Sequence, residues 1–172
     1  MTCVACGLLP VVKPSGPTSA WVVGRLRRTT GERRIGHSGT LDPAASGVLV
    51  AALGRATRLI PYLPEEKTYR ADIRLGRTTD TYDTDGRLLG EHPVPDLDRG
   101  DWEEALAGFR GVLQQKPPPY SAVRCHGTRA YHLARRGEAV DLPAREVRVH
   151  VLELKSWEPP TATVEVVCSS GP

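Results

Sequence analysis

The sequence predicts an α+β fold rather than a doubly wound one. Segments with strand character and segments with helix character are mixed along the chain without a regular strand–helix–strand repeat. The 172 residues are 40% hydrophobic, which is enough for a core and is typical of one domain of ordinary size.

The N-terminal third is expected to begin with a strand over residues 8–12, followed by a turn rich in Pro and Gly. A helix should then extend to about Arg28, capped by Thr18 or Ser19. Residues 29–42 indicate a loop rich in Gly and Arg. The small, apolar residues 43–53 are compatible with a helical turn followed by a strand, but their periodicity does not decide between helix and strand.

Residues 68–75 alternate between apolar and polar side chains, which predicts a half-buried strand with Tyr69 on its apolar face. An amphipathic helix is expected over 101–113, capped by Asp98 or Asp101. The remaining expected elements are an extended linker at 114–119, a strand at 120–125, a helix at 129–136 stopped by Gly137, and strands at 145–154 and 161–168.

Charge is unevenly distributed along the chain. Residues 13–37 have a local balance of +5, and residues 124–136 add four arginines and no acid. Residues 80–104 hold nine acids against two arginines, a balance of −7. The planar guanidinium fork suits phosphates, so the basic segments favour RNA or DNA as a partner over a merely solvated surface.

Several classes of protein are disfavoured. Neither a signal peptide nor an apolar run of membrane-spanning length is present, so we expect a cytoplasmic location and no membrane partner. Cys3 and Cys6 form a C-x-x-C pair without the second pair or the histidines of a zinc site. The segment 81–92 has the glycine of a calcium loop, but Thr81 and His92 stand where acids are required. No metal site is expected.

The most informative segment is GHSGTLDP at residues 36–43. An Asp directly before a Pro is typical of a helix start, with Asp42 as the N-cap and Pro43 at the first helical position. A histidine and two hydroxyls in the same turn, and the arginines just upstream, favour a second interpretation. In that interpretation Asp42 is the lone carboxylate of an enzyme that acts on a polyanion.

Residues 36–49, GHSGTLDPAASGVL, closely resemble the central motif of the TruB family of pseudouridine synthases. The other ordered matches are LPVVKPSGPTS at 9–19, KTYRA at 67–71, GRTTDTYDTDG at 76–86, PPYSA at 118–122 and the block at 129–137. The first of these resembles the family's opening motif, in which Val12 stands where an Asp is usual. The resemblance covers nearly the whole chain.

This resemblance implies the pseudouridine synthase fold, a mixed, largely antiparallel sheet flanked by helices. It implies an isomerase that converts uridine 55 in the TΨC loop of tRNA to pseudouridine after flipping the base out of its stack. No cofactor and no metal would be needed. Residues 1–172 would be the N-terminal part of the catalytic domain, and the protein would be a monomer.

The resemblance also implies site residues. Asp42 would be the nucleophile, which attacks ring C6 or sugar C1′ or removes a sugar proton, and the sequence does not choose among these steps. Tyr69 would lie against the uracil and serve the proton chemistry at C5; the alternative is a core tyrosine. The residues expected to contact RNA or position the loop are Lys13, His37, Gly39, Thr40 and Leu41.

Two of these residues have specific expected roles. His37 would contact or replace the extruded nucleotide, or be an ordinary hydrogen-bonded loop histidine. Lys13 would support the active-site loops or bind a phosphate.

The match ends at VVCSSGP, residues 166–172, which resembles the start of the family motif C-S-x-G-T-Y-I-R. Pro172 occupies the Thr position, so the arginine that the family uses beside its aspartate is not among these residues. We therefore expect a chain truncated at its C-terminus, without the family's RNA-binding extension. The alternatives to an active enzyme are an RNA-binding or RNA-chaperone remnant and an unstable fragment with an unpaired strand edge.

Overall fold

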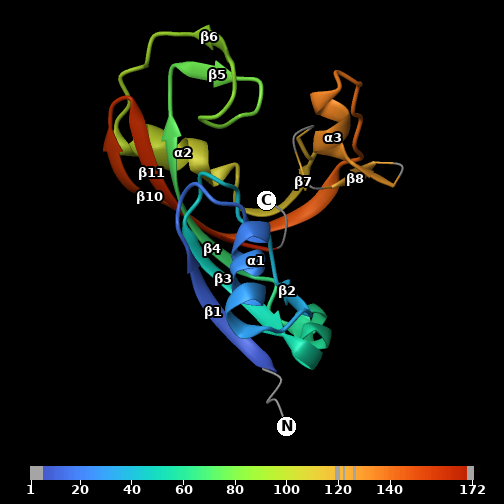
Figure 1. The fold of residues 1–172 in the computed structure, drawn as a ribbon. Coiled ribbons are helices and arrows are strands. Elements are labelled where there is room, and N and C mark those ends of the chain that lie inside the picture. The colour runs from blue at the N-terminus through green and yellow to red at the C-terminus, as the bar shows by residue number, and fades with distance from the viewer. Residues whose placement is uncertain (1–5, 119–120, 122, 126, 170–172) are drawn as a thin grey trace. The chain divides into compact units, whose positions relative to one another are not determined.

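The computed structural model describes residues 6–118, 121, 123–125 and 127–169. The chain divides into two compact units, Met1–Pro64 and Glu65–Pro172, and each is described by itself. The first unit runs from blue to blue-green in Figure 1, and the second from green to red. Every strand pairing in the described residues is antiparallel, and helices accompany the sheets, which confirms the predicted α+β class.

The first unit is a three-stranded sheet in the order β1-β3-β2, built from β1 (Gly7–Lys13), β3 (Gly47–Leu53) and β2 (Ile35–His37). Helix α1 (Ser19–Thr30) lies beside this sheet (Figure 1), and a 3-10 helix, η1 (Gly54–Tyr62), follows β3. The core between α1 and the sheet contains Val23, Ile35, Ala51 and Leu53, with Leu26 partly buried against them.

Local sequence signals set both ends of α1. The Thr18 side chain accepts a hydrogen bond from the Trp21 amide at 3.1 Å, which makes Thr18 the N-cap. At the other end Gly31 adopts a left-handed conformation with φ of 71°, and its amide donates to the Arg27 carbonyl at 3.0 Å. The predicted helix is confirmed and extends two residues past Arg28.

No helix begins at Asp42. The segment between β2 and β3 is irregular, and within it the Ala45 amide donates to the Asp42 carbonyl at 3.1 Å in a turn. The helix-start interpretation of the Asp-Pro pair is therefore wrong. The chain passes directly into β3, which pairs with strands on both sides, so sheet pairing prevails over the local helix signal. The loop expected at 29–42 likewise contains β2.

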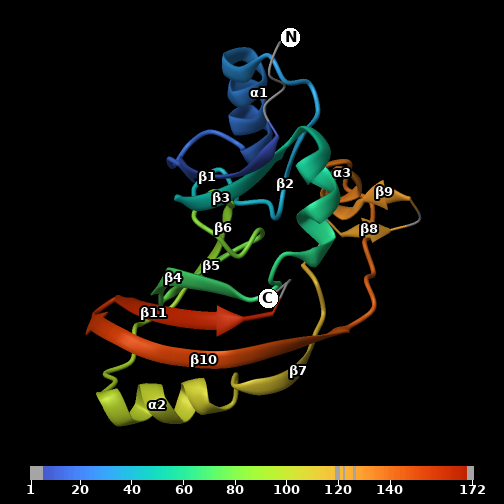
Figure 2. The same ribbon diagram turned by 90° about the horizontal axis from the view of Figure 1, so that it is seen from below.

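The second unit is a four-stranded sheet in the order β4-β11-β10-β7, built from β4 (Lys67–Arg74), β11 (Thr161–Cys168), β10 (Arg145–Glu158) and β7 (Gly111–Gln115). Helix α2 (Arg99–Ala107) runs along β10 (Figure 2). The helix contributes Trp102 and Leu106 to a core whose other buried members are Val149, Leu152, Leu154, Ala162, Val164 and Cys168.

Helix α2 is shorter than the predicted helix over 101–113. Its start is as expected, because Asp98 and Asp101 form a reciprocal capping box at 2.9 and 2.8 Å. The helix ends at Ala107, and Gly111, with φ of 88°, begins β7. Leu113 therefore lies opposite Val147 in the sheet rather than on a helix face, because this segment pairs with β10 instead of continuing the helix.

The predicted strand at 68–75 exists as β4, but it is not half-buried. Side chains on both faces are exposed, including Tyr69 at 40% and Ile73 at 38%. The physical reason is that β4 is an edge strand of its sheet, whereas the buried core of this unit lies on β10 and β11. Leu75, just past the strand, is partly buried against that core.

Smaller elements complete the second unit. Strand β5 (Arg77–Thr79) pairs with β6 (Leu88–Glu91), and β8 (Arg124–Cys125) pairs with β9 (Thr128–Arg129). The predicted helix at 129–136 is confirmed as α3 (Ala130–Arg135), followed by Gly137 with φ of 73°. Of the strand expected at 120–125, β8 is the part observed, and Tyr120 and Ala122 lie outside the described residues.

Candidate active site

Asp42 lies between two residues whose backbones are held by the segment that precedes α1. On its N-terminal side, the Ser19 hydroxyl accepts a hydrogen bond from the Leu41 amide at 2.9 Å and donates one to the Leu41 carbonyl at 3.1 Å. Ser19 is only 2% exposed, so water does not compete for these bonds. Both polar groups of the Leu41 peptide backbone are thus satisfied by one side chain.

On the C-terminal side of Asp42, the Pro43 carbonyl accepts two hydrogen bonds. The Gly16 amide donates one at 2.7 Å, and the Lys13 ammonium donates the other at 3.2 Å. Lys13 is fully buried and also donates to the carbonyls of Pro14 at 2.9 Å and Pro17 at 2.8 Å. Its three donors therefore meet three acceptors, and they join the 13–17 turn to the Asp42 loop, which is the irregular segment 38–46 between β2 and β3.

The Asp42 side chain itself is exposed. Within the residues that the structure describes, its carboxylate makes no hydrogen bond or ion pair. A carboxylate of this kind does not serve as a helix cap or a structural ion pair. The arrangement combines a held backbone with a side chain that is available to a ligand, which is what a catalytic carboxylate requires.

His37 ends β2, five residues before Asp42. Its Nδ1 atom is buried and has no hydrogen-bond partner among the described residues. A buried polar atom without a partner costs free energy, so such an atom in a folded protein calls for an explanation. Its place on the strand that leads into the Asp42 loop makes it a candidate contact for a bound nucleotide.

The other implied residues fall in two places. Gly39 and Thr40 are exposed in the irregular segment before Asp42, and Leu41 lies with its Cδ1 atom 3.7 Å from where a Cβ on Gly47 would stand. Tyr69 belongs to the second unit, on β4 opposite Val166. The first unit thus brings six of the seven implied residues into one segment and the turn that supports it.

The sequence reasoning missed two residues of this arrangement. The sequence predicts Ser19 only as a possible helix cap and Gly16 only as part of a turn, yet both hydrogen-bond to the residues that flank Asp42. The available signal was the KPSGPTS match itself, since a motif that resembles the family's opening block could be expected to touch its central block.

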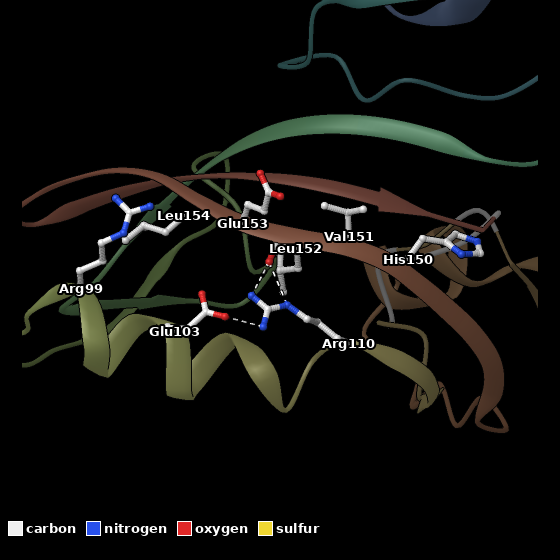
Figure 3. A pocket seen from close by; sticks show the side chains of 8 residues that line it. All are labelled: Arg99, Glu103, Arg110, His150, Val151, Leu152, Glu153 and Leu154. Atoms are coloured by element: carbon white, nitrogen blue, oxygen red, sulfur yellow. Dashed lines mark hydrogen bonds and ion pairs between the residues drawn. The ribbon is translucent and has the colours of Figure 1, made fainter.

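A cavity of about 570 Å³ lies elsewhere, between α2 and β10 in the second unit (Figure 3). Arg110 crosses it: Nε and Nη2 donate to the Leu152 carbonyl at 3.0 and 2.7 Å, and Nη1 donates to Glu103 at 2.7 Å. This contact lowers the pKa of Glu103 and raises that of Arg110. The guanidinium is engaged in structure, so we assign no function to the cavity.

Other classes of site find no support in the part of the chain that the structure describes. It contains no group of three or more His, Cys, Asp or Glu side chains that could hold a metal ion. None of its helices has the length and apolar character needed to cross a membrane. Cys3 lies outside the described residues; Cys6 is an exposed free thiol, and Cys168 is buried, which raises the pKa of its thiol.

Comparison with known proteins gives close relatives in sequence. The chain is 52% identical over 167 residues to tRNA pseudouridine synthase B of Synechococcus sp. (strain WH7803), covering 96% of this chain and 56% of that protein. It is 48% identical over 169 residues to the protein of the same name from Gloeobacter violaceus, covering 96% of this chain and 58% of that one. The chain therefore spans little more than half the length of these relatives.

Solved structures with the same fold include a chain from the crystal structure of a Cbf5–Nop10–Gar1 complex, with a TM-score of 0.70 and 28% identity, covering 96% of this chain and 40% of that one. The archaeal box H/ACA sRNP Nop10–Cbf5 complex contains another such chain, with a TM-score of 0.66 and 25% identity. The match covers 98% of this chain and 40% of that one.

The family model described as TruB family pseudouridylate synthase (N terminal domain) matches residues 27–172. This match covers most of the chain, and it includes the Asp42 loop together with β4 and its Tyr69. It confirms the resemblance seen in the ordered motifs, and the chain belongs to the TruB family.

Proposed function

We propose that this chain carries the catalytic aspartate of a tRNA pseudouridine synthase and that Asp42 acts on uridine 55 in the TΨC loop. The observation that carries the proposal is the exposed carboxylate of Asp42, which has no partner among the described residues and stands between two residues held by Ser19 and Lys13. The name of the relatives, tRNA pseudouridine synthase B, supplies the substrate class.

The proposed reaction is an isomerisation. The N1–C1′ bond of uridine breaks, the base turns, and C5 bonds to C1′; the proton on C5 leaves and N1 takes up a proton, so the formula is unchanged. Asp42 takes part by attacking C6, by attacking C1′, or by removing a sugar proton. Each step needs the carboxylate held against the flipped base, and misplacement by about 1 Å can cost on the order of a hundredfold in rate.

The supporting roles are those that the resemblance to the TruB family implies. Tyr69 would lie against the uracil ring and serve the proton transfer at C5. His37 would contact the nucleotide that base flipping displaces through its buried Nδ1, which has no partner within the described residues. Lys13 has its donors on three carbonyls, which supports the loop-holding role for it over a phosphate contact.

The wider expectations belong to the same proposal. Residues 1–172 would form the N-terminal part of a catalytic domain that works as a monomer, in the cytoplasm, without a metal or a cofactor. The RNA would be bound through exposed arginines, so its affinity should fall as salt rises.

The test uses the 172-residue chain, an unmodified tRNA transcript, and carbodiimide treatment followed by primer extension, which locates pseudouridine. We expect modification at position 55, abolished in Asp42→Asn and retained in Asp96→Asn, an exposed aspartate outside the matched motifs. Binding of tRNA should survive in both variants.

Other outcomes are informative. Modification at another uridine would contradict the assigned position, and activity in Asp42→Asn would contradict the assigned nucleophile. Tight binding by the unmodified chain without turnover would support the RNA-binding remnant instead.

A further inference from the structure

We propose that the outer edge of β4 pairs antiparallel with β4 of a second copy of this chain, and that this edge dimer and the tRNA substrate exclude each other. The pairing is independent of the proposed function. Only the exclusion rests on that function, because it concerns Tyr69, the residue proposed to lie against the uracil ring.

In the described part of the chain, β4 differs from the other edge strands of the two larger sheets. Proline interrupts the edge strand β1 at Pro10. Strand β2 has three residues, and the Arg27 side chain donates to its Ile35 carbonyl at 3.2 Å. Strand β7 has five residues and is followed by Lys116 and two prolines. Strand β4 has eight residues, contains no proline and pairs with β11 without a register shift, so its outer edge can accept another strand.

The hydrogen-bond pattern shows which backbone groups of β4 point away from β11. Arg74 lies opposite Thr161, and beside this pair the Leu75 amide donates to the Pro160 carbonyl at 2.9 Å. Arg74 and Thr161 are therefore a non-hydrogen-bonded pair, and the amide and carbonyl of Arg74 point outward. The pattern alternates along the strand, so the residues with outward backbone groups are Thr68, Arg70, Asp72 and Arg74.

The charges on β4 select one register for pairing with a second copy. When Ala71 lies opposite Ala71 of the second copy, the outward backbone groups face one another and Arg70 lies opposite Asp72 of the second copy. Opposite charges at directly opposed positions stabilise an antiparallel pair. A shift by two residues in either direction places Arg70 opposite Arg70 or Arg74 of the second copy, which is repulsive. A shift by one residue sets outward groups against inward ones, so they cannot bond.

Both charged side chains can bind a further partner. The Arg70 Nη2 atom lies 3.7 Å from a Glu165 carboxylate oxygen, a loose ion pair in which 70% of the Arg70 side chain is exposed. Asp72 is exposed, and its Oδ1 atom accepts a hydrogen bond from the Thr163 hydroxyl at 2.7 Å. A guanidinium has five donors and a carboxylate has about four acceptor positions, so these contacts leave room for the pair across the edge.

The same register covers the apolar face of β4. Tyr69 and Ile73 lie opposite Val166 and Ala162 of β11, on the face of the sheet that carries the core. In the edge dimer Tyr69 lies opposite Ile73 of the second copy, at a non-hydrogen-bonded position where side chains are closest. Tyr69 is 40% exposed and Ile73 38% exposed in the single chain, so the dimer covers surface that is otherwise open to water. A covered Tyr69 is not available to a uracil ring, so the edge dimer would be inactive and the tRNA-bound form a single chain.

The first experiment measures the edge dimer without RNA. Sedimentation equilibrium of the 172-residue chain, from about 1 to 200 µM, should show a monomer–dimer equilibrium. Arg70→Asp and Asp72→Arg each set like charges opposite one another, and each should weaken the dimer by about tenfold. An equimolar mixture of these two variants should regain the original affinity, because opposite charges then face each other again. The matched controls Arg148→Asp and Asp96→Arg change exposed residues away from β4 and should leave the dimer unchanged.

A second experiment checks the register. Ala71 would lie on the twofold axis at a non-hydrogen-bonded position, with the two Cα atoms about 4.5 Å apart, which a disulfide can span. Oxidation with copper phenanthroline in air should link two copies of Ala71→Cys. Ile73→Cys should give no more linked product than the native cysteines of the unmodified chain, because the two copies of residue 73 lie far apart in this register.

A third experiment tests the exclusion. An unmodified tRNA transcript should dissociate the edge dimer in sedimentation velocity runs. The rate of pseudouridine formation per chain should fall as the protein concentration rises through the dimer dissociation constant, and it should not fall in Asp72→Arg. A dimer that binds tRNA and stays intact would overturn the exclusion.

Failure of the inference and failure of the proposed function are distinguishable. A chain that stays monomeric to 200 µM but converts uridine 55 overturns only the edge dimer. A dimer that both single variants leave intact also overturns it, because another surface then joins the copies. If the variants and their mixture behave as expected but no pseudouridine forms, the pairing stands, and the proposed activity fails together with the exclusion.

Discussion

The Ser19 hydroxyl both accepts from the amide of Leu41 and donates to its carbonyl, at 2.9 and 3.1 Å. One buried side chain thereby holds the residue before Asp42, while Lys13 and Gly16 hold the carbonyl of the residue after it. The proposed nucleophile is therefore positioned from both sides by a segment that lies 22 to 30 residues earlier in the chain.

Replacing Ser19 with alanine should impair catalysis more than binding. The change removes both bonds to Leu41, so the loop can shift while the Asp42 carboxylate remains present. We expect kcat for pseudouridine formation to fall by about 10- to 100-fold with KM little changed. Steady-state assays with tRNA measure this split. Ser15→Ala is the control, since Ser15 is exposed in the same motif; an equal effect there would contradict the positioning role.

Replacing Lys13 with methionine should destabilise the fold. Three carbonyls lose their donor in a buried site, and we expect a loss of about 2 to 4 kcal/mol in the free energy of unfolding. Urea denaturation followed by circular dichroism measures it. Lys116→Met, which removes only a surface pair with Asp141, should change little. Equal stability of the two variants would show that the Lys13 contacts contribute nothing net.

Replacing His37 with phenylalanine should separate stability from activity. The buried Nδ1 atom of His37 has no partner in the part of the chain that the structure describes, so an apolar ring should leave stability unchanged or raise it by about 1 kcal/mol. Turnover of tRNA should fall, because the proposed contact with the displaced nucleotide is lost. Thermal melts and single-turnover assays on the same preparations test both parts, with the exposed His92→Phe as control. A marked loss of stability would instead indicate a structural histidine.

The Glu103–Arg110 pair should stabilise the second unit in a pH-dependent way. Its hydrogen bond lowers the pKa of Glu103 in the folded state. The stabilisation is therefore present above the unfolded pKa, about 4.3, and is lost as pH falls through the lower folded pKa. Urea titrations should show Glu103→Gln less stable than the unmodified chain at pH 7, and the difference should vanish toward pH 3.

The matched control for this pair is Glu104→Gln, the exposed neighbouring residue. It should show no such pH-dependent difference. A difference for Glu103→Gln that persists at pH 3 would mean that the carboxylate charge is not its cause.

The elements that were predicted well are those with local signals. Thr18 and Gly31 delimit α1, the Asp98 capping box starts α2, and the Val-rich stretches form β10 and β11. The errors occur where pairing with strands far along the chain decides the secondary structure of a segment. Leu113 fits a helix face by spacing but lies in β7 opposite Val147, and the Asp42-Pro43 pair fits a helix start but leads into a central strand.

The sequence by itself determined the family, the α+β class and Asp42 as the proposed nucleophile, because these depend on ordered motifs and local side-chain patterns. Only the tertiary structure decided that Ser19, Gly16 and Lys13 hold the loop around Asp42, and that β4 is an exposed edge. Hydrogen bonds between residues distant along the chain, and the burial that strengthens them, exist only once the chain has folded.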